Sequence, residues 1–153
     1  MVGSDFVSYV AVSLGAVGSV LSIINTINAL SQRKVHLKVS PAQAIIPNSN
    51  TVLVSVDVTN LSTFPITVNE IGMTIHRSKS RVVVFQPTVI DGGPFPRRLE
   101  PRESVCLLFD PKEASGEYVG KTYAKTACGV LATGTSPAFQ QIREMIRSGD
   151  FTA

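Results

Sequence analysis

The longest uncharged run in the sequence constrains the fold more than any other feature. No Asp, Glu, Lys or Arg lies between Phe6 and Gln32. A helix of about 25 residues rises roughly 37 Å, which exceeds the ~30 Å hydrocarbon core of a bilayer. The run therefore predicts a transmembrane helix over about residues 4–30, with its apolar centre at about residues 6–24.

The flanks of this run indicate its orientation. Arg33, Lys34 and Lys38 follow it, and the residues before it include Asp5 but no Lys or Arg. A cleaved signal peptide normally begins with positive charge, so the sequence favours a retained helix. The positive-inside rule then predicts a single-pass membrane protein whose C-terminal domain is cytoplasmic. Because Ser, Thr and Asn interrupt the run, a helix buried in a protein assembly or lying in the membrane surface remains the alternative.

Small side chains recur along one stripe of the predicted helix, at alternating steps of four and three residues. The stripe includes Ser8, Ala11, Gly15, Gly18 and Ser22. Helices associate in lipid where small residues let their backbones approach closely. The stripe therefore predicts a contact with a second copy or with another membrane protein, in addition to membrane lipid. A segment rich in Ser, Ala and Gly also produces such a stripe by chance, which is the alternative.

After Lys34 the hydrophobic period changes from helical to two. Valine occupies every second position from Val52 to Val58, which indicates a strand with one buried face. Gly, Pro, Asn and Asp mark the turns, and residues 41–50 are predicted to be a loop. Further strands are predicted at residues 35–39, 66–77, 81–86, 104–110 and 121–127, with a short one at 130–133. The pattern predicts a mainly β fold, an immunoglobulin-like antiparallel β-sandwich.

A short C-terminal helix completes the predicted architecture. Ser136 is a good N-cap, Pro137 suits the first helical position, and Gly149 supplies a stop. Apolar side chains recur between them at helical spacing, namely Phe139, Ile142, Met145 and Ile146. We expect a helix at residues 137–147 that packs on an open side of the sandwich or docks in a partner's groove. The predicted domains are residues 1–32 (membrane anchor), 33–135 (sandwich) and 136–153 (helix and tail).

Two segments combine strand and turn residues in a distinctive order. Val54–Gly72 joins a valine-rich strand that ends in Val-Thr-Asn to a Pro-Ile-Thr-Val strand, and Pro94–Val105 contains Pro-x-x-Leu-x-Pro-x-Glu-Ser. Over about residues 35–135 the chain thereby resembles a group of uncharacterised bacterial and phage proteins with an N-terminal apolar helix and an immunoglobulin-like sandwich. The resemblance implies this fold but no reaction. Arg102 stands where the group usually has Gly, which puts the form of that turn in doubt.

Residue types that carry out catalysis or bind metals are sparse and scattered. His36 and His76 lie in strand patterns without a nucleophile motif nearby, and Cys106 and Cys128 are far apart. A zinc site needs clustered Cys and His ligands, which this sequence does not offer. The two cysteines are expected to be small buried side chains or, in an oxidising compartment, a disulfide between strands. We expect no enzyme, no cofactor and no metal.

Positive charge in this sequence is modest and dispersed. The formal net charge is +3 and there is no Trp, so neither the electrostatic footprint of a nucleic-acid-binding protein nor a base-stacking platform is indicated. Two basic segments remain, a hairpin and a pair, and they contain Arg77, Lys79, Arg81, Arg97 and Arg98. These residues are expected to form solvated turns or to contact phosphates or an acidic partner.

These features predict a membrane-anchored, non-enzymatic binding or structural module, with a phage-encoded protein or virion component as one version. The alternative is a sensor–effector, in which the sandwich binds a ligand and the helix oligomerises in the membrane. A hydrolase is a third, weaker hypothesis. A deep pocket with convergent polar groups would favour the sensor, whereas a shallow, featureless sandwich would favour the module. The sequence indicates no small-molecule substrate.

Overall fold

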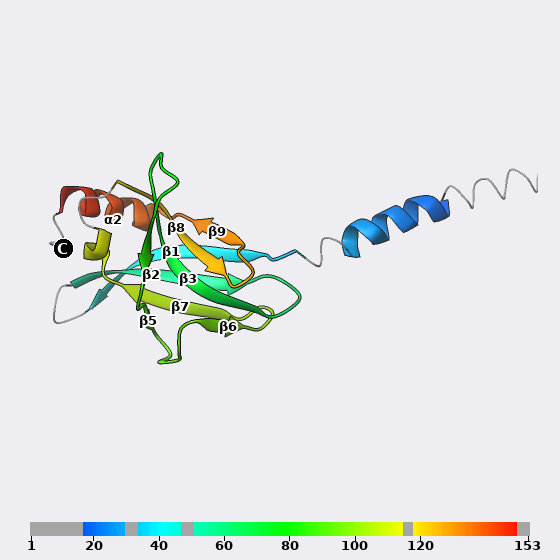
Figure 1. Cartoon of the computed structure of the whole chain (residues 1–153), viewed down its shortest axis with the longest axis horizontal. Coiled ribbons are helices and arrows are strands. Elements are labelled where there is room, and N and C mark those ends of the chain that lie inside the picture. Colours follow the sequence, from blue (N-terminus) through cyan, green and yellow to red (C-terminus); the bar gives the residue numbers. More distant parts are fainter. Residues whose placement is uncertain (1–16, 30–33, 47–50, 115–117, 150–153) are drawn as a thin grey trace, which may run out of the picture. The chain divides into compact units, whose positions relative to one another are not determined.

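The computed structural model describes residues 17–29, 34–46, 51–114 and 118–149 (Figure 1). The chain separates into two compact units, Met1–Lys34 and Val35–Ala153. In the first unit, residues 17–29 are helical. The predicted beginning of that helix near residue 4, and the stripe positions Ser8, Ala11 and Gly15, lie outside the described residues. Among the helices of the described residues, none is both long enough and apolar enough to cross a membrane.

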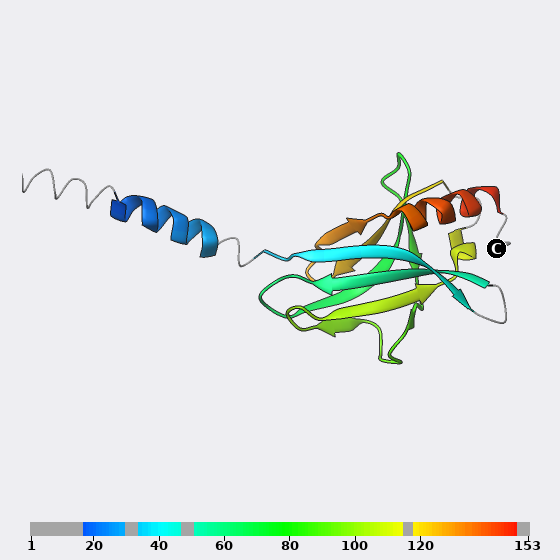
Figure 2. The same cartoon turned by 180° about the vertical axis from the view of Figure 1, so that it is seen from behind.

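The second unit consists of two packed antiparallel sheets, which confirms the predicted mainly β sandwich (Figures 1 and 2). One sheet has the order β1-β2-β7-β5 and the other β4-β3-β8-β9, with β6 also paired to β3. The bounds of the first sheet's strands are β1 Leu37–Ile46, β2 Thr51–Asn60, β7 Ser104–Phe109 and β5 Thr88–Val89. Those of the second are β4 Arg81–Val84, β3 Ile66–Ile75, β8 Val119–Thr126, β9 Leu131–Gly134 and β6 Arg97–Leu99.

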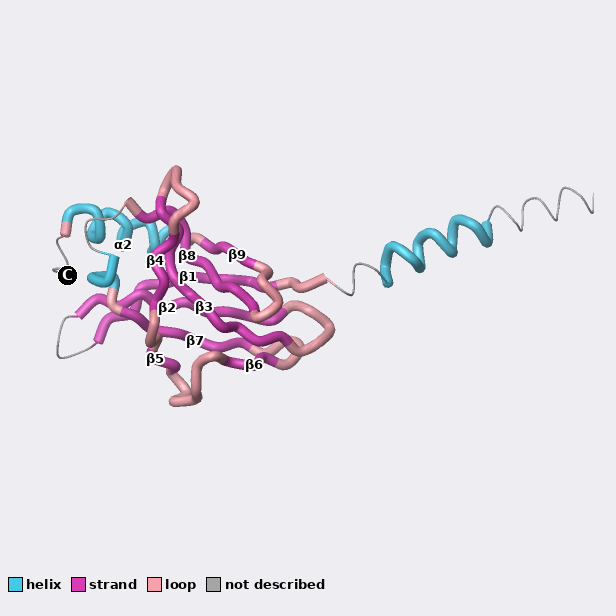
Figure 3. Tube along the Cα trace, in the orientation of Figure 1, coloured by secondary structure: helices cyan, strands magenta, loops and turns pink. Residues whose placement is uncertain are grey.

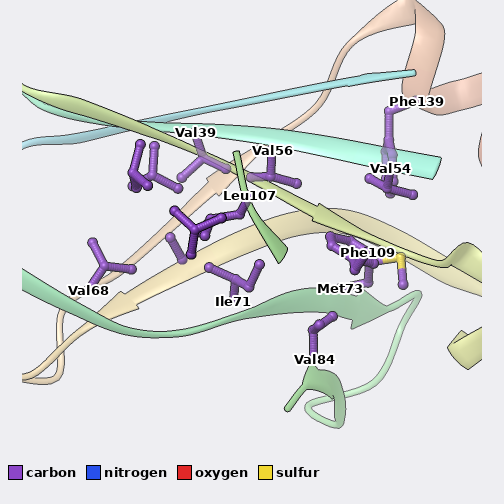
Figure 4. Close-up of a cluster of buried hydrophobic side chains, with 14 of the residues drawn as sticks. Val39, Val54, Val56, Val68, Ile71, Met73, Val84, Leu107, Phe109 and Phe139 are labelled. Carbon is purple, nitrogen blue, oxygen red and sulfur yellow. The ribbon is translucent and has the colours of Figure 1, made fainter. Parts of the chain in front are cut away.

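The core lies between the two sheets and uses alternate residues of the strands (Figure 4). Val54, Val56 and Leu107 from the first sheet and Ile71 and Met73 from the second are completely buried. Successive side chains of a strand point to opposite faces, so a valine at every second position of β2 supplies one side of this core. The period-two interpretation of the sequence is therefore confirmed for β2.

The predicted loop at residues 41–50 is wrong for its first part. Strand β1 continues through Pro41 to Ile46 and stays in register with β2, where Pro41 faces Val56 and Ile46 faces Thr51. Proline lacks a backbone N–H and is tolerated on edge strands, and β1 is at the edge of its sheet. Pairing with β2 therefore outweighs the local loop signal of the proline.

Two short strands were not predicted from the sequence. Residues 88–89 form β5 against β7, and residues 97–99 form β6 against the beginning of β3. Segments of this length are too short to show a hydrophobic period. Both strands depend on long-range pairing.

The C-terminal helix α2 (Pro137–Ser148) agrees with the sequence prediction to within one residue (Figure 3). The Ser136 side chain accepts a hydrogen bond from the Phe139 N–H at 3.0 Å, and Gly149 has a left-handed φ of 72° at the C-terminal end. Phe139, Ile142 and Ile146 are completely buried against the sandwich. Packing of α2 on the sandwich is therefore confirmed, and this apolar face is not free for a partner.

Both cysteines are free thiols, so the alternative of a disulfide between strands is not realised. Cys106 lies in β7, half-buried, with its Sγ 3.1 Å from Ser55 Oγ. Cys128 is exposed in the turn between β8 and β9. The expectation of a buried thiol is therefore wrong for Cys128, because it lies just beyond the end of a strand that the sequence prediction extended to residue 127.

Candidate functional site

The turn between β3 and β4, the beginning of β8 and helix α2 together line a cavity of about 400 Å³. Three of its lining residues have cationic side chains: Arg77 from the turn, Lys121 from β8 and Arg143 from α2. No acidic residue is among those that line it. The cavity is therefore a candidate site for an anion.

The β3–β4 turn positions Arg77 through its own hydrogen bonds. Ile75 N–H donates to Ser80 O at 3.1 Å, Ser78 N–H donates to Ile75 O at 3.2 Å, and Ser80 N–H donates to Ser78 Oγ at 3.0 Å. Arg77 has a positive φ of 57°, a conformation that few residues other than glycine adopt. The predicted basic hairpin is thus a tight turn held by these hydrogen bonds, and it places Arg77 in the lining of the cavity.

The beginning of β8 is fastened to the end of β3 beside the cavity. Thr74 Oγ1 accepts a hydrogen bond from Lys121 N–H at 2.9 Å and donates one to Lys121 O at 3.2 Å. His76 N–H donates to Tyr118 O at 2.7 Å. These bonds lie where the β3–β8 register shifts, between the pairs of Met73 and Ile75, and they place Lys121 next to the turn.

Helix α2 contributes Arg143, whose side chain is half-buried. Its guanidinium carbon lies 6.0 Å from the centroid of the Tyr118 ring, a cation–π contact. The Tyr118 ring in turn meets His76 edge-on, with 4.6 Å between the ring centroids. Arg143 Nε is buried, yet no group among the described residues accepts a hydrogen bond from it.

The cavity's cations are not neutralised by the described part of the chain. None of Arg77, Lys121 and Arg143 forms an ion pair with an acidic side chain in the segments 34–46, 51–114 and 118–149. Like charges gathered around one concave surface raise its positive potential. The arrangement suits binding of negative charge, and the described segments supply no carboxylate that pairs with these three cations.

Arg81, predicted with Arg77 and Lys79 as one basic surface, is already paired. Its guanidinium lies 3.5 Å from the Glu70 carboxylate and 5.2 Å from the centroid of the Tyr123 ring. Glu70 also accepts hydrogen bonds from Tyr123 Oη at 2.6 Å and from Lys125 Nζ at 3.3 Å. Arg81 therefore belongs to a polar cluster on the second sheet, while Lys79 lies at the exposed tip of the turn and does not line the cavity.

The second predicted basic pair also has acidic partners. Arg97 lies 2.8 Å from Asp91 and 3.9 Å from Glu103, and Arg98 lies 3.1 Å from Glu100. These pairs bridge β6 and its flanking turns, so both charges are compensated locally. Of the five basic residues predicted to contact an anionic partner, Arg77 alone lines the cation-lined cavity.

Lys121 and Arg143 were not identified as site residues from the sequence. They lie in different elements, and neither belongs to a basic run. The pairing of β8 with β3 and the burial of α2 bring them to Arg77. No local sequence pattern could have indicated that these three residues meet, because they are far apart in the chain and hydrophobic periodicity relates only residues that are close in sequence.

A second, more apolar cavity of about 640 Å³ lies beside β4 and is lined by Val82, Val83, Phe85, Gln86 and Glu113. Phe85 is 88% exposed, the largest such value among the exposed large apolar side chains.

Within the described ranges, no group of three or more His, Cys, Asp or Glu side chains could hold a metal ion. Comparisons with models of protein families and with curated proteins found no match to this chain.

Proposed function

We propose that this protein is a non-enzymatic binding or structural module held at a membrane by its N-terminal helix, with the sandwich on the cytoplasmic side. The observation that carries the proposal is the apolar surface of residues 17–29, where no described side chain is buried. The large apolar side chains there, all between 47% and 59% exposed, are Val17, Val20, Leu21, Ile23, Ile24 and Ile27. Apolar surface of this extent favours lipid or another helix over water.

The strand order supports an immunoglobulin-like assignment of the sandwich. β1-β2-β7-β5 corresponds to the A-B-E-D sheet of that fold, and β4-β3-β8-β9 corresponds to a C-F-G sheet extended by one strand. Folds of this kind host many functions, so the assignment itself implies no reaction. A binding role rests instead on the two cavities and their lining side chains.

The small-residue stripe supports a helix–helix contact within the membrane. A Cβ added at Gly18 would meet no atom of the described residues within 4 Å, so this part of the backbone is open to a second helix. We therefore propose that Gly18 and Ser22 lie on the contact face together with Ser8, Ala11 and Gly15. Gly18→Leu should weaken association in a membrane self-association assay, whereas Val17→Leu should leave it unchanged. Equal behaviour of the two variants would contradict the contact face.

Membrane fractionation of the full chain tests the anchor. The wild-type chain should stay with membranes in alkaline carbonate and be extracted only by detergent. Leu21→Lys makes insertion about 3 kcal/mol less favourable, because an ammonium near the centre of a span is poorly accommodated by hydrocarbon. That variant should move to the soluble fraction, while Leu21→Ile should remain with the membranes. Release of the wild-type chain by carbonate alone would refute the proposal.

The second candidate function is a sensor–effector in which the sandwich binds a ligand and the helix oligomerises. The cation-lined cavity favours it, because convergent charged groups are more typical of a ligand site than of an inert surface. The discriminating measurement is chemical cross-linking of the full chain in membranes with and without inorganic pyrophosphate. A change in the oligomer distribution supports the sensor, and an unchanged distribution supports the simple module.

A further inference from the structure

We propose that the cavity between the β3–β4 turn, β8 and α2 binds a small phosphate-bearing ligand. The inference rests on the proposed function only in taking the sandwich as a binding module. The cavity volume of about 400 Å³ falls in the range of roughly 300–1,000 Å³ that is typical of small-molecule sites. It exceeds what a bare ion needs, so we assign the site to a phosphate group carried by a small organic molecule.

Charge is the first argument for a phosphate. Arg77, Lys121 and Arg143 lie around one concavity, and no described acidic side chain forms an ion pair with them. A single carboxylate would compensate only part of that charge, whereas a phosphate ester carries close to two negative charges at neutral pH. The number of cations therefore matches a multivalent anion.

The unsatisfied N–H of Arg143 is the second argument. Buried polar groups in folded proteins are almost always hydrogen-bonded, yet no group among the described residues accepts a hydrogen bond from the buried Arg143 Nε. A guanidinium presents its N–H groups as a planar fork that fits two oxygens of a phosphate. Helix α2 holds Arg143 at the cavity, since the burial of neighbouring Ile142 anchors that turn of the helix.

Neutral donors complete the site. Ser78 Oγ accepts the hydrogen bond from Ser80 N–H at 3.0 Å, which leaves its hydroxyl proton available for a ligand oxygen. Thr135 and Gln140 also line the cavity and bring a hydroxyl and an amide. Hydroxyl and amide donors beside arginine are the groups that hold the remaining phosphate oxygens without further charge.

The test uses the full chain reconstituted in phosphatidylcholine vesicles, with radiolabelled pyrophosphate as the probe. The wild-type chain should bind the probe, and Arg77→Asn should weaken binding by about tenfold, as expected for the loss of one charged hydrogen-bonding partner. Asparagine is chosen because it tolerates a positive φ, so the turn should keep its form. Lys79→Asn is the matched control, because Lys79 lies in the same turn but does not line the cavity. Arg143→Gln should weaken binding similarly.

The source of the phosphate is distinguished by adding a phosphatidylinositol phosphate to the vesicles. Displacement of pyrophosphate by that lipid assigns the site to a lipid headgroup, and undiminished binding assigns it to a soluble phosphate compound. Absence of wild-type binding, or equal affinities of Arg77→Asn and Lys79→Asn, would overturn the proposal. Carbonate extraction of the same variants separates the two proposals, since Arg77→Asn should leave membrane retention unchanged.

Discussion

At the scale of single residues, backbone strain at Arg102 gives a direct link from sequence to stability. Arg102 has a positive φ of 69° and follows Pro101 in the turn that joins β6 to β7. Glu103 N–H donates to Glu100 O at 3.0 Å across this turn. Proline at the second position and a positive φ at the third are the marks of a type II turn, which favours glycine at the third position.

Arg102→Gly should therefore stabilise the protein by about 0.5–1 kcal/mol. The left-handed conformation costs a residue with a Cβ roughly 1–2 kcal/mol, and the extra backbone entropy of glycine in the unfolded chain offsets part of the gain. Urea denaturation of the full chain in detergent would measure the change. Arg102→Ala is the control, because it removes the charge but keeps the Cβ. An equal gain from the two substitutions would show that charge, rather than backbone strain, is responsible.

Glu70 should make the free energy of unfolding depend on pH in the acidic range. The hydrogen bond from the Tyr123 hydroxyl lowers the pKa of Glu70 most, Lys125 and Arg81 lower it further, and partial burial acts in the opposite direction. Around the ordinary carboxyl pKa of 4.5 the unfolded chain then binds a proton that the folded chain does not. Stability from Glu70 is present above this pH and is lost as the pH falls through the lowered folded pKa.

The variant that checks this pH dependence is Glu70→Gln. It should be less stable than the wild-type chain near neutral pH, and the difference should shrink as the solution is acidified below the ordinary carboxyl pKa. Urea denaturation across this range measures both. Glu113→Gln, at an exposed carboxylate, is the control and should change the free energy of unfolding at neutral pH by less than about 0.5 kcal/mol. A constant difference for Glu70→Gln would mean that its ion pairs do not contribute.

At the scale of elements, Asn60 connects the end of β2 to two other segments. Its side chain is completely buried. The Nδ2 group donates to Phe64 O at 2.9 Å, Leu99 O at 3.1 Å and Glu100 O at 3.3 Å, while Oδ1 accepts from Ser62 N–H at 2.8 Å. One amide thus joins the β2–β3 loop to the end of β6, which accounts for an asparagine at the end of a valine-rich strand.

Asn60→Asp should destabilise the protein by about 2–4 kcal/mol. The substitution keeps the shape but replaces a donor to three carbonyl oxygens with a buried carboxylate, which leaves polar groups unsatisfied. Chemical denaturation at neutral pH would measure the loss. Asn69→Asp, at an exposed position of β3, should change the free energy of unfolding by less than about 0.5 kcal/mol. If Asn60→Asp and Asn69→Asp changed the free energy of unfolding by similar amounts, the hydrogen bonds of Asn60 would not be what connects these segments.

At the scale of the sandwich domain, the two sheets approach each other at Gly134. A Cβ added there would collide with the carbonyl oxygen of Val39 in β1, so β9 and β1 meet backbone to backbone. This contact joins the edge strand of one sheet to the edge strand of the other. Glycine is required for the close approach rather than for an unusual φ.

Gly134→Ala should destabilise the sandwich by about 1–3 kcal/mol, since the added methyl group meets backbone atoms that cannot move independently of their strand. Amide hydrogen exchange should increase along β1 and β9 before the rest of the sandwich. Thr133→Ala, the exposed neighbour in β9, should cost less and leave exchange in β1 unchanged. Equal hydrogen-exchange patterns in Gly134→Ala and Thr133→Ala would mean that the close contact between β1 and β9 does not stabilise these strands.

Local signals in the sequence were sufficient to predict the elements whose form depends on residues close together in the chain. The alternation of valines in β2 and the caps of α2, Ser136 and Gly149, act over a few residues, so each could be predicted without knowing the fold. The mainly β sandwich followed from the sum of such signals. The immunoglobulin-like assignment and the membrane anchor remain proposals.

Tertiary structure alone decided the features that depend on distant partners. Pairing with β2 keeps residues 41–46 in a strand despite Pro41. Glu70 compensates the charge of Arg81, although the two residues lie eleven positions apart and no sequence pattern indicates that they pair. The cation-lined cavity exists because β8 and α2 carry Lys121 and Arg143 to the turn at Arg77. Charge and hydrogen bonding act through space, whereas periodicity is read along the chain, so the anion site appears only in the folded protein.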